Sequence, residues 1–148
     1  MLMAVPRFER FFRLAAGLDV DKDDLKRFSD FVFDEIHDLL LIGRVAAKSN
    51  RRDVIELYDL PITKGLQERM HEFEKLDAQL ELAPILASLA ARPQMDVSIG
   101  DETEARLPTV AGGVGVALAR SFRILEPRLK NPQTAHWERA FHLFDLLL

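Results

Sequence analysis

One helical pattern in the first half of the chain constrains the fold more than any other feature of the sequence. From Leu25 to Ala46, apolar residues recur at every third or fourth position, which is the spacing of one face of an α-helix. The pattern predicts a helix of about 25 residues that is capped by Asp23 or Asp24 and ends at Ser49-Asn50. Stretches that alternate between apolar and polar residues are almost absent, so the chain is predicted to be all-α.

Shorter helical patterns flank this long helix, and the same order of lengths occurs twice. Asp59 is expected to cap the third helix and Asn131 the last one. Pro108 fits poorly inside the second long helix, so this helix is expected to start there, with residues 101–104 as a separate capped turn. Glycine and proline punctuate the loops between these patterns. The predicted helices cover approximately residues 6–16, 25–50 and 59–76 in the first half, and 81–91, 108–126 and 131–148 in the second half.

Length and composition favour one soluble domain. With 148 residues, the chain is expected to form a single unit, residues 1–148, made of two halves, residues 1–76 and 77–148. The absence of cysteine excludes disulfides, cysteine-based zinc sites and a thiol nucleophile. The longest apolar run, residues 110–119, is shorter than the ~18 residues that a membrane span needs. The N-terminus shows no signal-peptide pattern, so we expect a cytoplasmic protein without a membrane partner.

A motif after the first long helix points to a known class of folds. Arg52 lies seven residues before Asp59, and this spacing resembles the second loop of archaeal-type histones, in which the arginine pairs with an aspartate that opens the last helix. Val54 stands where those histones usually have a threonine. The order of short, long and short helices is also the layout of the histone fold. The whole chain resembles a small bacterial family of single-chain, double histone-fold proteins of unknown function, most clearly in residues 19–25, 59–62 and 129–134.

The resemblance implies that the two histone-fold-like halves embrace as two histone subunits do, so that one chain forms a handshake pseudo-dimer. Arg52 and Asp59 would then be a structural pair, with Asp59 capping a helix. The second half lacks such a pair, because no aspartate lies seven residues after Arg128 or Lys130. A chain that is paired internally has less need to associate further, so a monomer is expected and a homodimer stays open.

Small residues recur on one face of the second long helix. Such residues allow another helix to approach within ~8 Å, and the expected neighbour is the first long helix. The alternative is that the glycines are only tolerated, although each costs ~1 kcal/mol relative to alanine. The residues of this small face are Ala111, Gly112, Gly115 and Ala119.

The resemblance also identifies the loops that would contact DNA, since histone pairs bind phosphate where the first loop of one half lies beside the second loop of the other. At one end, the acidic segment 19–24 would lie beside Arg128 and Lys130. At the other end, Arg51–Arg52 would lie beside residues 96–104, which contain four acids and no base. Each basic loop would thus face an acidic one, which weakens the counterion release that duplex binding requires.

The first helix carries three further candidates for DNA contact, spread over about 120° of its circumference. Their alternative role is that of solvated residues on the outer face of a helix. The net charge of −4 opposes a general attraction to nucleic acid. These three residues are Arg7, Arg10 and Arg13.

Two hypotheses for function follow, and neither is enzymatic. The first is a protein-interaction or structural module with an unidentified protein partner, which the acidic balance favours. The second is a nucleoid-associated protein that binds the duplex backbone without sequence preference. Catalytic motifs are absent: residues 112–115 follow no strand and do not form a phosphate-binding loop. No cofactor or metal is expected, because the four histidines, His37, His71, His136 and His142, are scattered without metal-ligand spacing.

Overall fold

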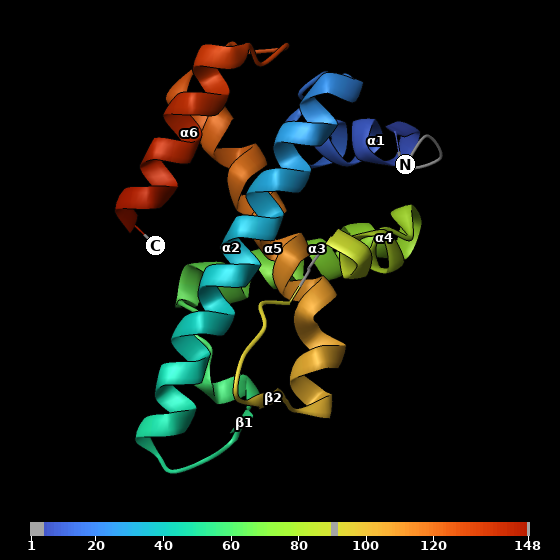
Figure 1. The fold of residues 1–148 in the computed structure, drawn as a ribbon. Helices are drawn as coiled ribbons and strands as arrows, with labels where there is room; N and C mark the ends of the chain where they lie inside the picture. Colours follow the sequence, from blue (N-terminus) through green and yellow to red (C-terminus); the bar gives the residue numbers. More distant parts are fainter. Residues whose placement is uncertain (1–4, 90–91, 148) are drawn as a thin grey trace.

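The structure is a computed structural model that describes residues 5–89 and 92–147 (Figure 1). Within these residues it is mostly helical, which confirms the all-α prediction. None of the helices in the described ranges is both long and apolar enough to span a membrane. The elements in chain order are α1 (Val5–Ala16), α2 (Lys22–Ser49), β1 (Val54–Ile55), the short 3-10 helix η2 (Leu57–Asp59), α3 (Lys64–Leu80), α4 (Ala83–Leu89), β2 (Ser98–Ile99), α5 (Asp101–Leu125) and α6 (Thr134–Leu147).

The two long helices, α2 and α5, run the length of the molecule in opposite directions and cross near their middles (Figure 1). Helices α1 and α6 lie at the end where α2 begins and α5 finishes. The two short strands lie at the opposite end, where they form a parallel pair. Each half of the chain therefore contributes one long helix between two shorter ones, and each end of the molecule combines loops from both halves.

Helix α2 begins earlier than the sequence predicted, because a different aspartate caps it. The carboxylate of Asp21 accepts hydrogen bonds from the backbone N–H groups of Asp23 (2.9 Å) and Asp24 (3.0 Å). The Asp24 carboxylate in turn accepts from the backbone N–H of Asp21 (3.1 Å). Asp24 is thus the reciprocal member of a capping box and not the N-cap itself.

Helix α3 begins five residues after the predicted cap, and the prediction for Asp59 was wrong in this respect. Asp59 ends η2, where its carboxylate is already bound to Arg52 and to the backbone of Glu56. Thr63 takes the capping role instead, since its hydroxyl accepts from the backbone N–H of Leu66 over 3.1 Å. The helix continues to Leu80 instead of ending at residue 76.

Two helices of the second half also begin at residues other than those predicted. Helix α5 begins at Asp101 and contains Pro108, because residues 101–104 form its first turn instead of a separate one. Three acids in this turn stabilise the positive end of the helix dipole. Helix α6 begins at Thr134, since the carbonyl of Gln133 and not Asn131 accepts the first helical hydrogen bonds. Helix α4 is observed from residue 83 to residue 89, and its predicted end near residue 91 lies outside the described residues.

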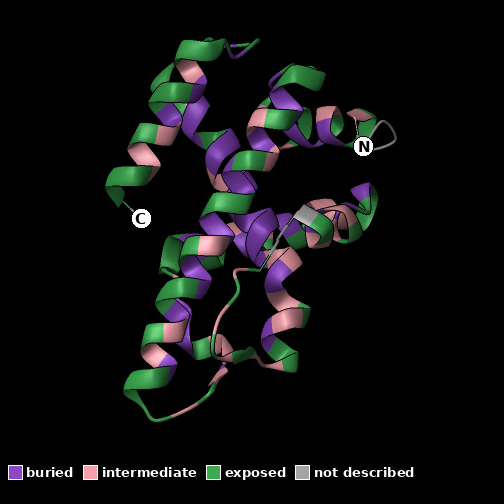
Figure 2. Ribbon diagram, viewed as in Figure 1, coloured by how far each residue is buried: buried purple, intermediate pink, exposed green. Residues whose placement is uncertain are grey.

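Aromatic rings from five helices fill the centre of the molecule. Phe12 of α1 lies 6.0 Å from Trp137 of α6, and Phe122 of α5 lies 4.9 Å from the same indole, measured between ring centroids. Phe28 of α2 and Phe73 of α3 both contact α1 rings. These rings are at most 4% exposed, and Figure 2 shows the helix crossings as the buried part of the fold. The core therefore joins helices of both halves.

The small face of α5 meets a different neighbour from the one predicted. A Cβ atom on Gly112 would lie 2.2 Å from the Phe73 ring, and one on Gly113 would lie 3.0 Å from the backbone nitrogen of Met70, both in α3. Only Gly115 faces the first long helix, where a Cβ would lie 3.0 Å from Phe28. The closest helix approach is thus between α5 and α3. Ala111 and Ala119 are fully buried in the same core.

We expect Gly112→Ala to destabilise the protein by about 2 kcal/mol, because the added methyl group would collide with the buried ring of Phe73. Urea unfolding followed by circular dichroism measures this change. Gly65→Ala is the matched control, because its added carbon would have no neighbour closer than 4.0 Å and should be neutral or stabilising by up to about 1 kcal/mol. Equal effects of the two substitutions would contradict the close approach of α3 and α5.

Candidate functional site

The first candidate region is the end of the molecule where the α1–α2 loop meets the α5–α6 loop. The backbone N–H of Asp19 donates to the carbonyl oxygen of Lys130 over 2.7 Å, so the acidic and basic loops lie side by side as predicted. Arg128 and Lys130 are exposed, and neither side chain forms an ion pair with the described part of the chain. Of the facing acids, Asp21 and Asp24 are occupied in capping α2.

Arg123 holds this end together, and the sequence analysis missed it. From the last turn of α5, its guanidinium donates to the carbonyl oxygens of Ala16 (2.6 and 3.1 Å) and Gly17 (3.1 Å) at the end of α1. It also donates to the carbonyls of Pro127 (2.8 Å) and Leu129 (2.7 Å). Terminal helix carbonyls lack intrahelical partners, and a cation satisfies them well. No local signal marks Arg123, since its α1 partners lie more than 100 residues away in the sequence.

The second candidate region is the opposite end, where β1 and β2 pair. Val54 lies opposite Ser98 and Ile55 opposite Ile99, and the buried hydroxyl of Thr103 donates to the Ile55 carbonyl over 3.0 Å. The segment after α2 therefore lies beside the acidic segment before α5, again as predicted. This contact fixes the position of both loops relative to the helix ends that they connect.

Arg52 and Asp59 form a bidentate ion pair at this end. The two guanidinium nitrogens of Arg52 donate to the two carboxylate oxygens of Asp59 over 2.6 Å each, and the backbone N–H of Glu56 donates to the same carboxylate over 2.8 Å. Only 3% of the Asp59 side chain is exposed. The bonds from Arg52 hold the pKa of Asp59 below its ordinary value. Arg52 is therefore committed to the loop, while Arg51 is exposed and has no ion-pair partner among the described residues.

Two more basic residues near this end are bound by one acid. Arg44 donates to both carboxylate oxygens of Asp96 over 2.7 and 3.2 Å, and the Nζ atom of Lys48 lies 2.5 Å from the same group. The two cations hold the pKa of Asp96 well below its usual range. No local pattern in the sequence marks this cluster, which joins α2 to the segment before β2 and in which one carboxylate offsets one of two positive charges.

The three arginines of α1 do not form one basic surface. Arg7 donates to the carbonyl oxygen of Glu81 over 3.3 Å, and Arg13 lies 3.6 Å from the Asp19 carboxylate. Arg10 is exposed and has no ion-pair partner in the described ranges. Of the seven basic candidates predicted from the sequence, four therefore keep free side chains: Arg10, Arg51, Arg128 and Lys130.

Glu35 is an unexpected buried acid in the middle of α2. The residue is 8% exposed, and burial raises the pKa of its carboxyl to about 7. The nearby carboxylates of Asp38, Asp145 and Asp34 act in the same direction. Asp145 belongs to α6, so charges of two helices act on this carboxyl. The helical periodicity did not reveal this burial, because acidic residues close together in a helix, such as Asp34, Glu35 and Asp38, are usually exposed to solvent.

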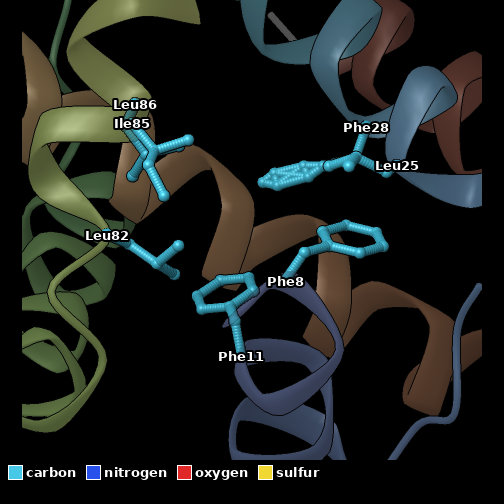
Figure 3. Close-up of a pocket in the computed structure, with 7 residues that line it drawn as sticks. All are labelled: Phe8, Phe11, Leu25, Phe28, Leu82, Ile85 and Leu86. Atoms are coloured by element: carbon cyan, nitrogen blue, oxygen red, sulfur yellow. The ribbon is translucent and has the colours of Figure 1, made fainter. Parts of the chain in front are cut away.

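One small cavity in the fold is entirely apolar. A cavity of about 20 Å³ lies between α1, α2 and α4, and all of its lining residues are apolar (Figure 3). This volume is close to that of a single water molecule and offers no polar partner. No group of three or more histidine and acidic side chains within the described ranges could hold a metal ion. His136 is bound to Glu126 over 2.5 Å.

A wider apolar groove of about 380 Å³ opens between α3, α5 and α6. Ile124 is 80% exposed at its edge, and Leu147 is 73% exposed. The cations at its rim, Arg69 and Arg120, are paired with Glu72 over 3.0 and 2.6 Å. The groove therefore offers apolar contact area without free charge.

Comparisons with known proteins find relatives of unknown function. A family described as "Domain of unknown function (DUF1931)" matches residues 8–145. A crystal structure of a protein from Thermus thermophilus is 53% identical, with a TM-score of 0.88, and the match covers 100% of both chains. An uncharacterized protein of Aquifex aeolicus (strain VF5) is 30% identical over 80% of this chain and 77% of its own length. A second one is 24% identical over 73% of this chain, which spans only 63% of that relative.

We expect Asp59→Asn to destabilise the protein by about 2 kcal/mol at pH 7, because the variant loses a charged hydrogen-bond acceptor for Arg52. The pKa of Asp59 is lowered in the fold, so its contribution is present above the ordinary pKa of 3.8 and is lost as the pH falls through the lower folded value. Urea unfolding at pH 7 and pH 3 measures both effects. Asp53→Asn, in the exposed neighbour, is the control and should change little at either pH.

We expect Glu35→Gln to stabilise the protein at pH 8 by about 2 kcal/mol. The folded pKa is about 7 and the ordinary value is 4.5, so the unfolded chain loses this proton first as the pH rises. The destabilisation of the fold by Glu35 is absent below pH 4.5, grows between pH 4.5 and about pH 7, and is complete above pH 7. Thermal unfolding at pH 4.5 and pH 8 tests this. The exposed Glu138→Gln should show no such pH dependence, and an equal gain at both pH values would contradict the burial argument.

Proposed function

The chain belongs to the DUF1931 family of proteins of unknown function, and on that premise we propose that it is a non-enzymatic protein-interaction or structural module. In this proposal, two histone-fold-like halves pair within one chain, with α1 to α3 in the first half and α4 to α6 in the second. Three features support it. The order of a short, a long and a medium-length helix occurs twice, the helices α2 and α5 cross, and at each end a loop of one half lies beside a loop of the other half.

The observation that carries the proposal is the internal use of positive charge. At one end, Arg52, Arg44 and Lys48 are bound to acids of the same end. At the other end, Arg123 is saturated by carbonyl groups. Phosphate binding by counterion release needs several unopposed cations close together. The cations named above bind groups of the same chain instead, so they stabilise the fold. This favours binding to proteins over binding to DNA.

Duplex DNA is the second candidate ligand, and one observation favours it. The side chains of Arg10, Arg51, Arg128 and Lys130 are exposed and carry no ion pair with the described residues. Arg51 lies at one end of the molecule, and Arg128 and Lys130 at the other, so the backbone of a long duplex would have to contact both ends.

Catalysis is not part of the proposal. Acid–base or metal chemistry needs converging polar groups in a site that excludes water. The small cavity of Figure 3 is apolar, and Glu35, whose pKa burial raises to about 7, does not line it.

The test is the binding of a fluorescent duplex of about 60 base pairs, followed by anisotropy from about 20 to about 300 mM salt. We expect a dissociation constant weaker than about 100 µM even at the lowest salt, because the free cations are few and separated. Tight binding that weakens steeply with salt would overturn the proposal in favour of DNA.

A charge-reversal variant identifies the surface if binding is found. Arg51→Glu with Arg128→Glu and Lys130→Glu should abolish loop-mediated binding. Arg52 is left unchanged, because its loss would break the pair with Asp59. Reversal of the exposed Lys75 is the control, since this residue lies inside α3 and outside both loops.

A further inference from the structure

The outward face of α2 exposes apolar side chains over four helical turns. We name the four exposed apolar residues, together with the His37 ring that stacks on Phe33, the α2 stripe: Phe33, His37, Leu41, Ile42 and Val45. The exposed fractions are 41% for Phe33, 39% for Leu41, 46% for Ile42 and 58% for Val45. The rings of Phe33 and His37 are stacked 6.1 Å apart. Single exposed apolar residues are ordinary, but a run at helical spacing on one face indicates a contact surface. Figure 2 shows exposed turns along this helix.

Charges border the α2 stripe in a fixed order. Asp34 and Asp38 lie beside its first half and are exposed, whereas Arg44 and Lys48 lie beside its second half with 38% and 41% of their side chains exposed. At 1.5 Å per residue, the centres of the acidic and basic pairs lie about 15 Å apart along the axis. The face is therefore negative at one end, positive at the other and apolar between them.

We propose that the α2 stripe is the interface of a homodimer in which the α2 helices of two copies pack antiparallel across a two-fold axis near Leu41. In this register Asp34 lies at the same level along the axis as the partner's Lys48, and Asp38 at the same level as the partner's Arg44. A two-fold contact requires a surface that complements itself, and a polarised helix does so only in the antiparallel direction. A parallel pair would place acid against acid and base against base.

The ion cluster around Asp96 is compatible with this contact. Asp96 binds Arg44 and Lys48 from within the chain, which orders both side chains before association. An ammonium group has three donors and a guanidinium has five, so each cation can bind a second carboxylate from the partner. The groove between α3, α5 and α6 lacks such an order of charges, because its lining carries the cations Arg69 and Arg120 and no acid. We therefore place the second copy on α2.

This inference rests on the proposed interaction function, in that it names one partner for it. The two can fail separately, because self-association is measured without DNA and DNA binding is measured on its own. A monomeric result would remove the homodimer and leave the anisotropy result unchanged. Tight DNA binding would overturn the proposed function and leave the sedimentation result unchanged.

The absence of cysteine from the chain gives a direct test. Leu41→Cys introduces a single thiol at the proposed axis, where it would meet its own copy. Mild oxidation of the full chain at tens of micromolar should convert most of the protein into a disulfide-linked dimer, as seen on a non-reducing gel. Ile124→Cys is the control, because Ile124 is 80% exposed but lies on the other apolar surface, so this variant should form no disulfide-linked dimer. A failure of the first variant to cross-link, or equal cross-linking of both, would overturn the interface.

Charge reversal tests the register without a covalent trap. Sedimentation velocity should show a concentration-dependent dimer for the unmodified chain, and Asp34→Lys should weaken its association at least tenfold, since it would face the partner's Lys48. Glu138→Lys makes the same charge change at an exposed position of α6 and should leave the dissociation constant unchanged. Equal constants for the two variants, or a monomer at all concentrations for the unmodified chain, would overturn the antiparallel pairing.

Discussion

The close contact of α5 with α3 is the constraint on which the rest of the structure depends. Gly112 and Gly113 leave no side chain between the two helices, so the ring of Phe73 and the backbone at Met70 occupy the space where Cβ atoms would lie. Because α5 is buried along most of its middle, each further helix can cover another of its sides. The glycines cost helix propensity, and the dense aromatic core that they permit offsets that cost.

The two ends of the molecule are fastened by different chemistry, although both combine loops from the two halves. One end uses a salt bridge within a single loop, Arg52 with Asp59, together with the short parallel strand pair. The other end has no equivalent aspartate, and Arg123 instead binds carbonyl groups at the end of α1 and in the loop after α5. Guanidinium groups suit both tasks, because five donors in one plane can bind a carboxylate or several carbonyls.

Sequence reasoning recovered the features that depend on local periodicity. It predicted six helices and their order of lengths, because apolar spacing and turn residues act over a few positions. The proximity of the loops was predicted from the resemblance to histone folds instead. It failed at Asp59, Pro108 and Asn131, where a residue suited to a helix start has a different role. An aspartate can cap a helix or bind an arginine, and only the folded chain decides between these roles. Arg123 and Glu35 were missed for the same reason, since their partners and their burial come from distant segments.

The distribution of charge separates the surfaces that hold the fold from the surface proposed to hold a partner. Asp59 is almost fully buried, and its ion pair with Arg52 would be costly to break, so this pair cannot be redirected to an outside ligand. The charges along α2 are exposed, and pairs of this kind contribute little to stability but strongly to the choice and orientation of a partner. Arg52 is thus committed to the fold, whereas the exposed charges along α2 are able to recognise a partner. In that arrangement the apolar residues of α2 supply affinity, and Asp34, Asp38, Arg44 and Lys48 supply direction.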